Sequence, residues 1–223
     1  MNIGRIIKGV GGNYYVSAKG KIYKCSARGK FRKAKITPTV GDYVQFTILD
    51  ENECEGALDT IEKRKNILLR PRVANIDCAI ITFAATSPDI NRDLLDRFLI
   101  LAETQNIPKV IICINKSDLV SQEEKDTFAN IYEPYYKVVF TSAEKNIGID
   151  QLKEEIHGCE SVFAGPSGVG KSSLINRLIP ESNRQTGEIS RKIERGKHTT
   201  RQVELLRADE ETYIVDSPGF TSL

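Results

Sequence analysis

The pattern of apolar and polar positions divides the chain near residue 70. Before that point, short runs in which apolar and polar side chains alternate are separated by turns rich in glycine, asparagine and charged residues. These runs cover residues 2–8, 14–17, 22–26, 44–49 and 57–62. Because such alternation is typical of half-buried strands, the segment predicts a five-stranded OB-type β-barrel, an architecture that often binds nucleic acid.

After residue 70, continuous apolar runs alternate with segments of helical periodicity. Strands are predicted at 76–84, 109–114, 137–141, 160–164, 202–207 and 212–215, and helices near 92–105, 121–132, 149–157 and 171–179. Strands joined by crossover helices predict an α/β fold with a doubly wound, mostly parallel six-stranded sheet. We therefore expect two domains, a barrel over 1–68 and an α/β domain over 69–223, with a linker at 68–72.

Residues 165–172, Gly-Pro-Ser-Gly-Val-Gly-Lys-Ser, match the P-loop pattern G-x-x-x-x-G-K-[ST] between a predicted strand and a predicted helix. The glycines allow main-chain N–H groups to turn inward around phosphate oxygens, and the helix N-terminus adds the positive end of its dipole. Lys171 is expected to reach the β- and γ-phosphates, and Ser172 to ligate Mg²⁺. The predicted phosphate-binding residues are Gly165, Pro166, Ser167, Gly168, Val169, Gly170, Lys171, Ser172 and Ser173.

A second motif, Asn115-Lys116-Ser117-Asp118, follows the apolar run at 109–114. The Asp118 carboxylate can accept hydrogen bonds from N1–H and N2–H₂ of guanine, a pair of donors that adenine lacks. Asn115 can bond N7, and the Lys116 stem can lie over the ring. Thr-Ser-Ala follows about 25 residues later, where a main-chain N–H is expected to face guanine O6. The predicted guanine-binding residues are Asn115, Lys116, Ser117, Asp118, Ser142 and Ala143.

A third motif, Asp216-Ser-Pro-Gly219, follows the last predicted strand and matches D-x-x-G. This pattern places a carboxylate near Mg²⁺ and a glycine N–H near the γ-phosphate. Between residues 186 and 200 the chain is charged and poor in apolar residues, which predicts a mobile loop whose Thr199 or Thr200 closes on Mg²⁺. We favour Thr200, so that Ser172, Thr200 and Asp216 are the expected metal ligands; a plain surface loop is the alternative.

Phe220 stands where Ras-like enzymes have a glutamine that orients the attacking water. Phenylalanine cannot do this, and His198 in Gly-Lys-His-Thr-Thr is a candidate to position the water or to act as a base. An exposed loop histidine is the competing interpretation. Lys171, His198 and Thr200 are therefore the expected catalytic residues.

The order of the motifs is reversed relative to an ordinary GTPase, because the guanine-reading motif precedes the P-loop. Every other expected part is present. The sequence therefore predicts a circularly permuted GTPase domain.

Charge is distributed unevenly along the chain. Residues 1–40 hold ten Lys or Arg and no Asp or Glu, although the whole chain carries a formal charge of only +2. A loop within this segment is expected to contact RNA phosphates, with one aromatic ring for stacking, unless it is simply a solvated loop on an OB or SH3-like barrel. Its residues are Arg28, Lys30, Phe31, Arg32, Lys33 and Lys35.

These features together resemble one bacterial family, the ribosome small-subunit-dependent GTPases called RsgA or YjeQ. The resemblance covers essentially the whole chain and rests on the N-terminal barrel, the permuted order and the motifs at 165–173, 196–200 and 216–220. It implies hydrolysis of GTP with Mg²⁺, binding to the small ribosomal subunit and its rRNA, stimulation by that subunit, and a role in its late assembly. A monomer is expected.

The family pattern also implies a C-terminal zinc-binding helical domain, whereas this sequence ends at Leu223, so zinc is not assigned to this chain. The alternatives are a permuted GTPase acting on another RNA or the large subunit, and a non-hydrolysing RNA-binding module with a degenerate nucleotide domain. Five cysteines without a C-x-x-C pair, and no signal peptide or membrane-spanning run, predict a cytoplasmic protein with reduced thiols that does not bind membranes.

Overall fold

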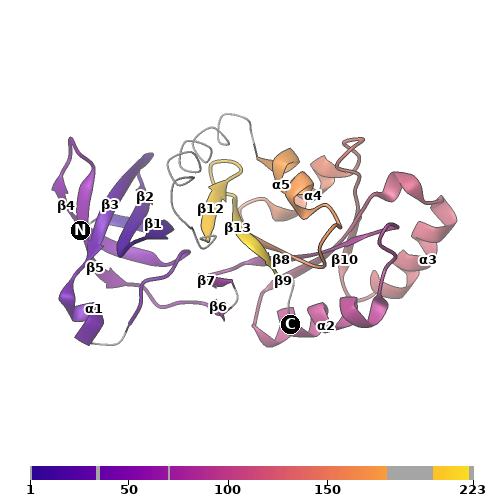
Figure 1. Ribbon diagram of the computed structural model, residues 1–223, viewed down its shortest axis with the longest axis horizontal. Coiled ribbons are helices and arrows are strands. Elements are labelled where there is room, and N and C mark those ends of the chain that lie inside the picture. Colours follow the sequence, from indigo (N-terminus) through magenta and orange to yellow (C-terminus); the bar gives the residue numbers. More distant parts are fainter. Residues whose placement is uncertain (1, 34–35, 70, 180–202, 221–223) are drawn as a thin grey trace. The chain divides into compact units, whose positions relative to one another are not determined.

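The computed structural model describes residues 2–33, 36–69, 71–179 and 203–220 (Figure 1). The chain forms two compact units, the first built mainly from residues up to Ile76 and the second mainly from Asp77 onward. Each unit buries its own set of apolar side chains.

The first unit contains a five-stranded barrel with the hydrogen-bonded order β1-β2-β3-β5-β4, which a further pairing between β1 and β4 closes. The strands are β1 (Asn2–Val10), β2 (Asn13–Ala18), β3 (Lys21–Ala27), β4 (Tyr43–Asp50) and β5 (Glu55–Ile61). Only the β3–β5 pair is parallel. Alternate side chains such as Ile6, Val16 and Phe46 are fully buried, so the expected OB-type barrel is confirmed.

The segment predicted as a linker is instead a hairpin of β6 (Ile67–Leu69) and β7 (Arg72–Ala74). Within the first unit, the backbone of Gly41 approaches this hairpin so closely that a Cβ at Gly41 would lie 2.1 Å from the Ala74 carbonyl oxygen. Asn75 Nδ2 also donates to the Gly41 carbonyl at 2.8 Å. The linker prediction is wrong because these contacts, between residues more than 30 positions apart, hold the segment on the barrel.

In the described part of the chain, the strands that lie wholly or partly in the second unit follow the order β10-β9-β8-β11-β13-β12. The first five are parallel to their neighbours, and β12 is joined to β13 by a tight turn. The strands are β8 (Cys78–Ala84), β9 (Lys109–Asn115), β10 (Lys137–Phe140), β11 (Glu160–Ala164), β12 (Glu204–Arg207) and β13 (Tyr213–Phe220). The helices are α2 (Arg92–Thr104), α3 (Gln122–Tyr132), α4 (Ile149–Ile156) and α5 (Lys171–Leu178), with a 3₁₀ turn at Ser117–Leu119. The doubly wound, mostly parallel sheet is therefore confirmed.

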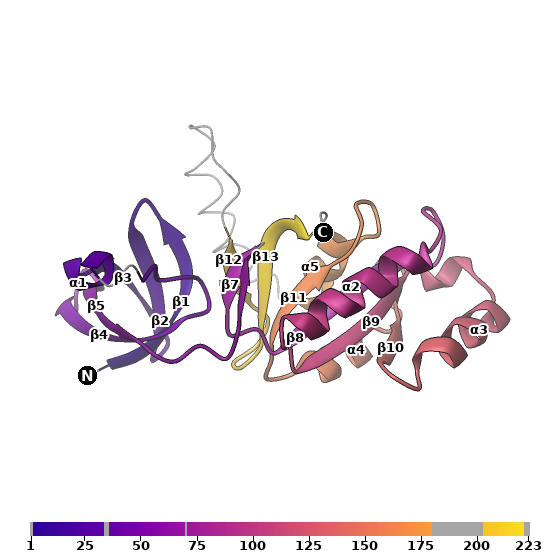
Figure 2. The ribbon, with the colours of Figure 1, turned by 90° about the horizontal axis from the view of Figure 1, so that it is seen from below.

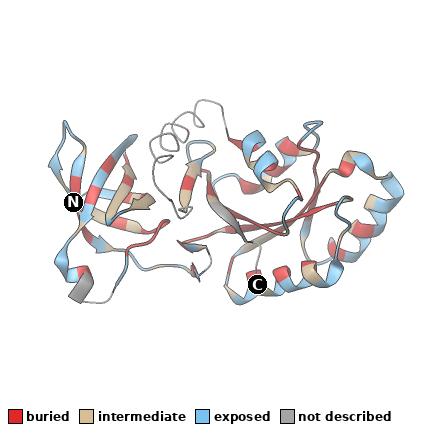
Figure 3. Ribbon diagram, viewed as in Figure 1, coloured by how far each residue is buried: buried red, intermediate tan, exposed pale blue. Residues whose placement is uncertain are grey.

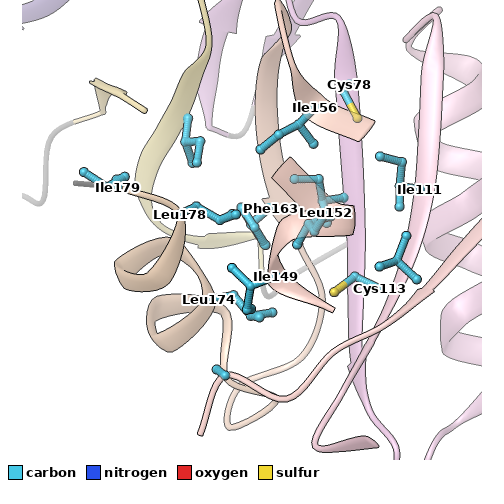
Figure 4. Packing of buried hydrophobic residues seen from close by; sticks show 14 residues of the cluster. Cys78, Ile111, Cys113, Ile149, Leu152, Ile156, Phe163, Leu174, Leu178 and Ile179 are labelled. Atoms are coloured by element: carbon cyan, nitrogen blue, oxygen red, sulfur yellow. The ribbon is translucent and has the colours of Figure 1, made fainter. Parts of the chain in front are cut away.

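Alternate residues of the central strands face opposite layers of helices. Cys78 and Ile80 of β8 belong to a buried cluster with side chains of α4 and α5 (Figure 4). The intervening residues face the other side, where the rings of Phe83 and Phe98 of α2 lie 6.1 Å apart. Figure 2 shows α2 lying along the sheet, and Figure 3 shows buried strands beneath helices whose outer surfaces are exposed. This two-sided burial explains the continuous apolar runs of the sequence.

Strand β13 extends beyond the range that the sequence predicts. It pairs with β11 at Val162↔Val215 and next at Ala164↔Phe220. Between these two pairs β13 advances by five residues while β11 advances by two. Residues 216–219 therefore bulge out of the regular pairing. This bulge carries the D-x-x-G motif.

The longest helix in the described part of the chain, α2, has 13 residues. Among those residues, no helix is both long and apolar enough to cross a membrane.

Candidate nucleotide-binding site

The candidate site lies where three parallel strands end at one edge of the second sheet. β9 ends at Asn115, β10 ends just before Thr141, and β11 ends just before Gly165. Because parallel strands direct their carboxyl ends to the same edge, the three sequence motifs that follow them meet there. Open α/β sheets bind ligands at such an edge, and here the edge is built from segments up to 54 residues apart.

Two glycines of the P-loop are required by its geometry. Gly165 has φ +138°, and a Cβ there would lie 2.0 Å from the Thr82 carbonyl oxygen. Gly170 has φ +95°, and a Cβ there would lie 2.2 Å from Asn115 Nδ2. Both backbone conformations favour glycine, and both positions lack room for a side chain. Among the described residues, no side chain makes a capping hydrogen bond at Gly170, the residue before α5.

The Lys171 ammonium lies against the loop that precedes it. Its Nζ donates to the main-chain oxygens of Gly165 at 2.7 Å and Pro166 at 2.5 Å. Burial lowers the pKa of this lysine, because the charged form is partly removed from water. A desolvated cation beside a helix N-terminus is suited to an anionic ligand such as a phosphate chain.

The Asn115 side chain forms hydrogen bonds with both the P-loop and the Thr-Ser-Ala turn. This side chain is buried, with Nδ2 donating to the Val169 carbonyl at 2.9 Å and Oδ1 accepting from the Ala143 N–H at 3.1 Å. One amide therefore connects the P-loop with the Thr-Ser-Ala turn. Sequence reasoning missed this connection; the signal was the position of Asn115 at the end of a fully apolar run. Its contact with guanine N7 stays a prediction.

Asp118 lies in the 3₁₀ turn beside the Thr-Ser-Ala segment. A hydrogen bond from the Ser142 hydroxyl lowers the pKa of Asp118, so the carboxylate is ionised at neutral pH and accepts hydrogen bonds. Lys116 Nζ donates to the Ser87 carbonyl. Ser117 is 1% exposed and donates its N–H to the Thr141 carbonyl at 3.0 Å. This main-chain bond joins the N-K-S-D turn to the Thr-Ser-Ala segment, and a contact of the Ser117 side chain with guanine stays a prediction.

A cavity of about 610 Å³ joins these elements. It is lined by Asn115, Lys116, Asp118, Leu119, Ser142, Ala143, Glu144, Gly170, Ser173, Asn176 and Arg177. Sequence reasoning missed Asn176 and Arg177. Both follow Ser173 at the i+3 and i+4 positions of a helix, so helical periodicity could have placed them on the same face. A cavity of this size is within the range of small-ligand sites.

Other predicted site residues are only partly described. Asp216 follows Val215 on β13, the strand beside β11, and the backbone of Gly219 belongs to the same strand. Ser172 is exposed in the first turn of α5. A hydroxyl and a carboxylate suit Mg²⁺, which takes oxygen ligands and is commonly completed by substrate phosphates. His198, Thr199 and Thr200 lie outside the described residues.

The basic segment of the first unit differs from the expected loop. It contains a short helix, α1 (Gly29–Lys33), and Phe31 is only 6% exposed. The prediction that Phe31 offers a stacking ring is wrong, because this aromatic side chain is buried and leaves little surface for a base. Arg28 pairs with Asp59 at 3.0 Å, and Lys30 is exposed.

The side chains of Arg32 and Lys33 and the whole of Lys35 lie outside the described part of the structure. Their contact with RNA stays a prediction. Exposure of Lys30 is compatible with a phosphate contact.

Comparison with known families matches both units. A model of the RsgA GTPase family matches residues 61–223, and a model of the RsgA N-terminal domain matches residues 3–57. The small ribosomal subunit biogenesis GTPase RsgA of Alkaliphilus metalliredigens is 52% identical over 224 residues, covering 100% of this chain and 76% of the relative. The protein of the same name from Clostridium beijerinckii is 50% identical over 221 residues, covering 99% and 74%.

Two solved structures have the same fold over nearly the whole chain. YjeQ from Thermotoga maritima superposes with a TM-score of 0.82 at 32% identity, covering 99% of this chain and 75% of that one. YloQ, described as a circularly permuted GTPase, gives a TM-score of 0.80 at 38% identity, covering 100% and 73%. The permuted arrangement expected from the motif order is therefore confirmed.

Proposed function

The chain belongs to the RsgA GTPase family, and on that premise we propose that it hydrolyses GTP in the biogenesis of the small ribosomal subunit. The observation that carries the proposal is the convergence of the N-K-S-D turn, the Thr-Ser-Ala turn and the P-loop helix on one cavity. The names of the curated relatives support the ribosomal part.

We propose that each motif acts on a different part of GTP. The Asp118 carboxylate reads the guanine N1–H and N2–H₂ donors, and the P-loop N–H groups and Lys171 hold the phosphates. When bound, Mg²⁺ supplies positive charge that offsets the charge developing on the phosphate oxygens. Catalysis then depends on orientation and on electrostatic stabilisation of the transferring phosphoryl group.

The partner that we propose is the small ribosomal subunit with its rRNA, contacted in part by the basic barrel over residues 1–68. The GTPase domain would then be the second unit, which lies mainly from Asp77 onward. A cytoplasmic monomer fits this role. The test is to measure GTP turnover alone, with purified small subunits and with purified large subunits. Stimulation by the small subunit alone supports the proposal. Stimulation of the same size by the large subunit would favour the large subunit as the partner.

Replacing His198 with alanine is expected to lower kcat at least tenfold while nucleotide affinity stays near the wild-type value. The reason is that general acid–base or water-positioning groups contribute on the order of 10²–10⁴-fold, and Phe220 cannot orient water. Single-turnover hydrolysis and GDP titration measure the two quantities. His157→Ala is the matched control, because His157 is the only other histidine and its side chain is 66% exposed beside Asp209. Wild-type kcat in His198→Ala would make His198 an ordinary loop residue.

Replacing Lys30, Arg32, Lys33 and Lys35 with glutamine is expected to weaken binding to the small subunit and to flatten its salt dependence by about three units of slope. Each phosphate contact contributes a slope of roughly 0.7–0.9 through counterion release. Arg28 is left in place, because its pairing with Asp59 contributes to the barrel.

The matched control removes the same charge elsewhere on the first unit, at the exposed residues Lys19, Lys24, Lys63 and Arg72. In this control variant, the salt dependence of binding to the small subunit should flatten less than in the variant of the basic segment. Equal slopes in both variants and the wild type would show that neither group contacts rRNA.

A further inference from the structure

We propose that Arg177 is a positioning residue that sets the preference for a 6-oxo purine. It would do so by holding the turn at Ser142–Ala143–Glu144 in the orientation that presents the Glu144 main-chain N–H to guanine O6. The inference rests on the proposed GTP site and adds a specificity residue to it. No motif in the sequence points to Arg177.

The contact runs from the P-loop helix to the base-reading turn. Arg177 Nε donates to the Ala143 carbonyl at 2.8 Å, and its Nη2 lies 3.5 Å from the Glu144 carbonyl. A guanidinium has several N–H donors in a fixed planar arrangement, so it can hold two successive carbonyls in one orientation. The partners are 34 residues apart in the chain.

Peptide planarity transmits this contact to the other side of the turn. In a trans peptide, the carbonyl of Ala143 and the N–H of Glu144 point in opposite directions within one rigid plane. Fixing the carbonyl toward α5 therefore directs that N–H away from α5. The next peptide is fixed in the same way, with the Lys145 N–H donating to the Ser142 hydroxyl at 3.1 Å. The orientation of the turn thus depends on Arg177 on one side and Ser142 on the other.

The same turn is adjacent to the residues that read the base. Ala143 N–H is 3.1 Å from Asn115 Oδ1, and Ser142 lines the same cavity as Asp118. All of these residues, and Arg177 itself, line the same cavity. Arg177 follows Lys171 by six positions on α5, which corresponds to about 9 Å along a helix. One helix would therefore connect the phosphate end of the site to the base end.

The test compares three ligands by the change that each shows between wild type and variant. GDP and inosine diphosphate both carry the 6-oxo group and N1–H, whereas 2-aminopurine riboside diphosphate lacks both and keeps the 2-amino group. In Arg177→Ala, affinity for GDP and inosine diphosphate should each fall by about tenfold, the effect of one misplaced hydrogen bond. Affinity for the 2-aminopurine ligand should not change. Arg177→Lys should lie between wild type and Arg177→Ala, since an ammonium lacks the planar fork.

The matched control is Arg207→Ala. Arg207 makes the same kind of contact with another turn, with Nε 2.8 Å from the Asp209 carbonyl and Nη2 3.3 Å from the Glu210 carbonyl. Its removal should leave all three affinities unchanged. Thermal unfolding of each variant shows that the fold is retained.

Two results would overturn the inference while leaving the GTP site intact. One is wild-type affinity for GDP in Arg177→Ala. The other is an equal loss for all three ligands, which would mean a general loosening of the site. If the wild-type protein itself binds ADP as well as GDP, the proposed function fails and this inference fails with it.

Discussion

Replacing Lys171 with alanine is expected to reduce GTP hydrolysis by a factor on the order of 10²–10³ or more, because it removes a cation preorganised for the β- and γ-phosphates. The ammonium is held against the P-loop by the Gly165 and Pro166 carbonyls, at 2.7 and 2.5 Å. Positive charge fixed in this way needs no reorganisation as charge develops in the transition state. Turnover of GTP at saturating substrate measures the effect.

The substitution should not unfold the protein. Burial lowers the pKa of Lys171, which means that the folded environment disfavours its charged form, so removing the charge relieves a cost. Lys153→Ala is the matched control, since this exposed lysine of α4 pairs with Asp150 at 3.4 Å. Wild-type turnover in Lys171→Ala would contradict the P-loop assignment. Ser172→Ala should give a similar loss through Mg²⁺.

Replacing Asp118 with asparagine is expected to lower GTP affinity by a factor on the order of 10² or more and to create a preference for xanthine nucleotides. The carboxylate accepts from two guanine donors, whereas an amide presents one donor that suits the 2-oxo group of xanthine. The asparagine oxygen can still accept from the Ser142 hydroxyl, so the turn should remain in place. Calorimetric titration with GDP and xanthosine diphosphate measures both affinities.

Asp150→Asn is the control for this experiment, because it removes a carboxylate whose side chain is 90% exposed on α4. Unchanged GDP affinity in Asp118→Asn would mean that the N-K-S-D segment is only a surface turn.

The pKa of Asp118 is lowered, which bears on the pH dependence of nucleotide binding. Since the ionised form persists below the ordinary pKa of an aspartate, this residue should not make nucleotide binding pH-dependent between about pH 5 and 8.

The local pattern of the sequence determined most of the secondary structure. The apolar run at 109–114 corresponds to β9 at Lys109–Asn115, and the run at 160–164 coincides with β11. Such runs predict strands from the sequence alone, because a strand that is covered on both faces is apolar along most of its length. The sequence also predicts the P-loop, because its backbone has positive φ at Gly165 and Gly170, where glycine is favoured.

Contacts between distant segments decided what the sequence could not. The linker prediction failed because Asn75 and Ala74 dock on Gly41, and the predicted stacking ring of Phe31 is buried. The bulge in β13 likewise depends on its pairing with β11.

In the candidate site, too, local sequence determined some features and contacts between distant segments determined the others. The motifs are local and were identified from residue order, whereas their connections are not local. Asn115 bonds Val169 across 54 residues, and Arg177 bonds Ala143 across 34. Hydrogen-bond partners of this kind are fixed by which strands lie side by side in the sheet, a property of the tertiary structure that no window of sequence contains.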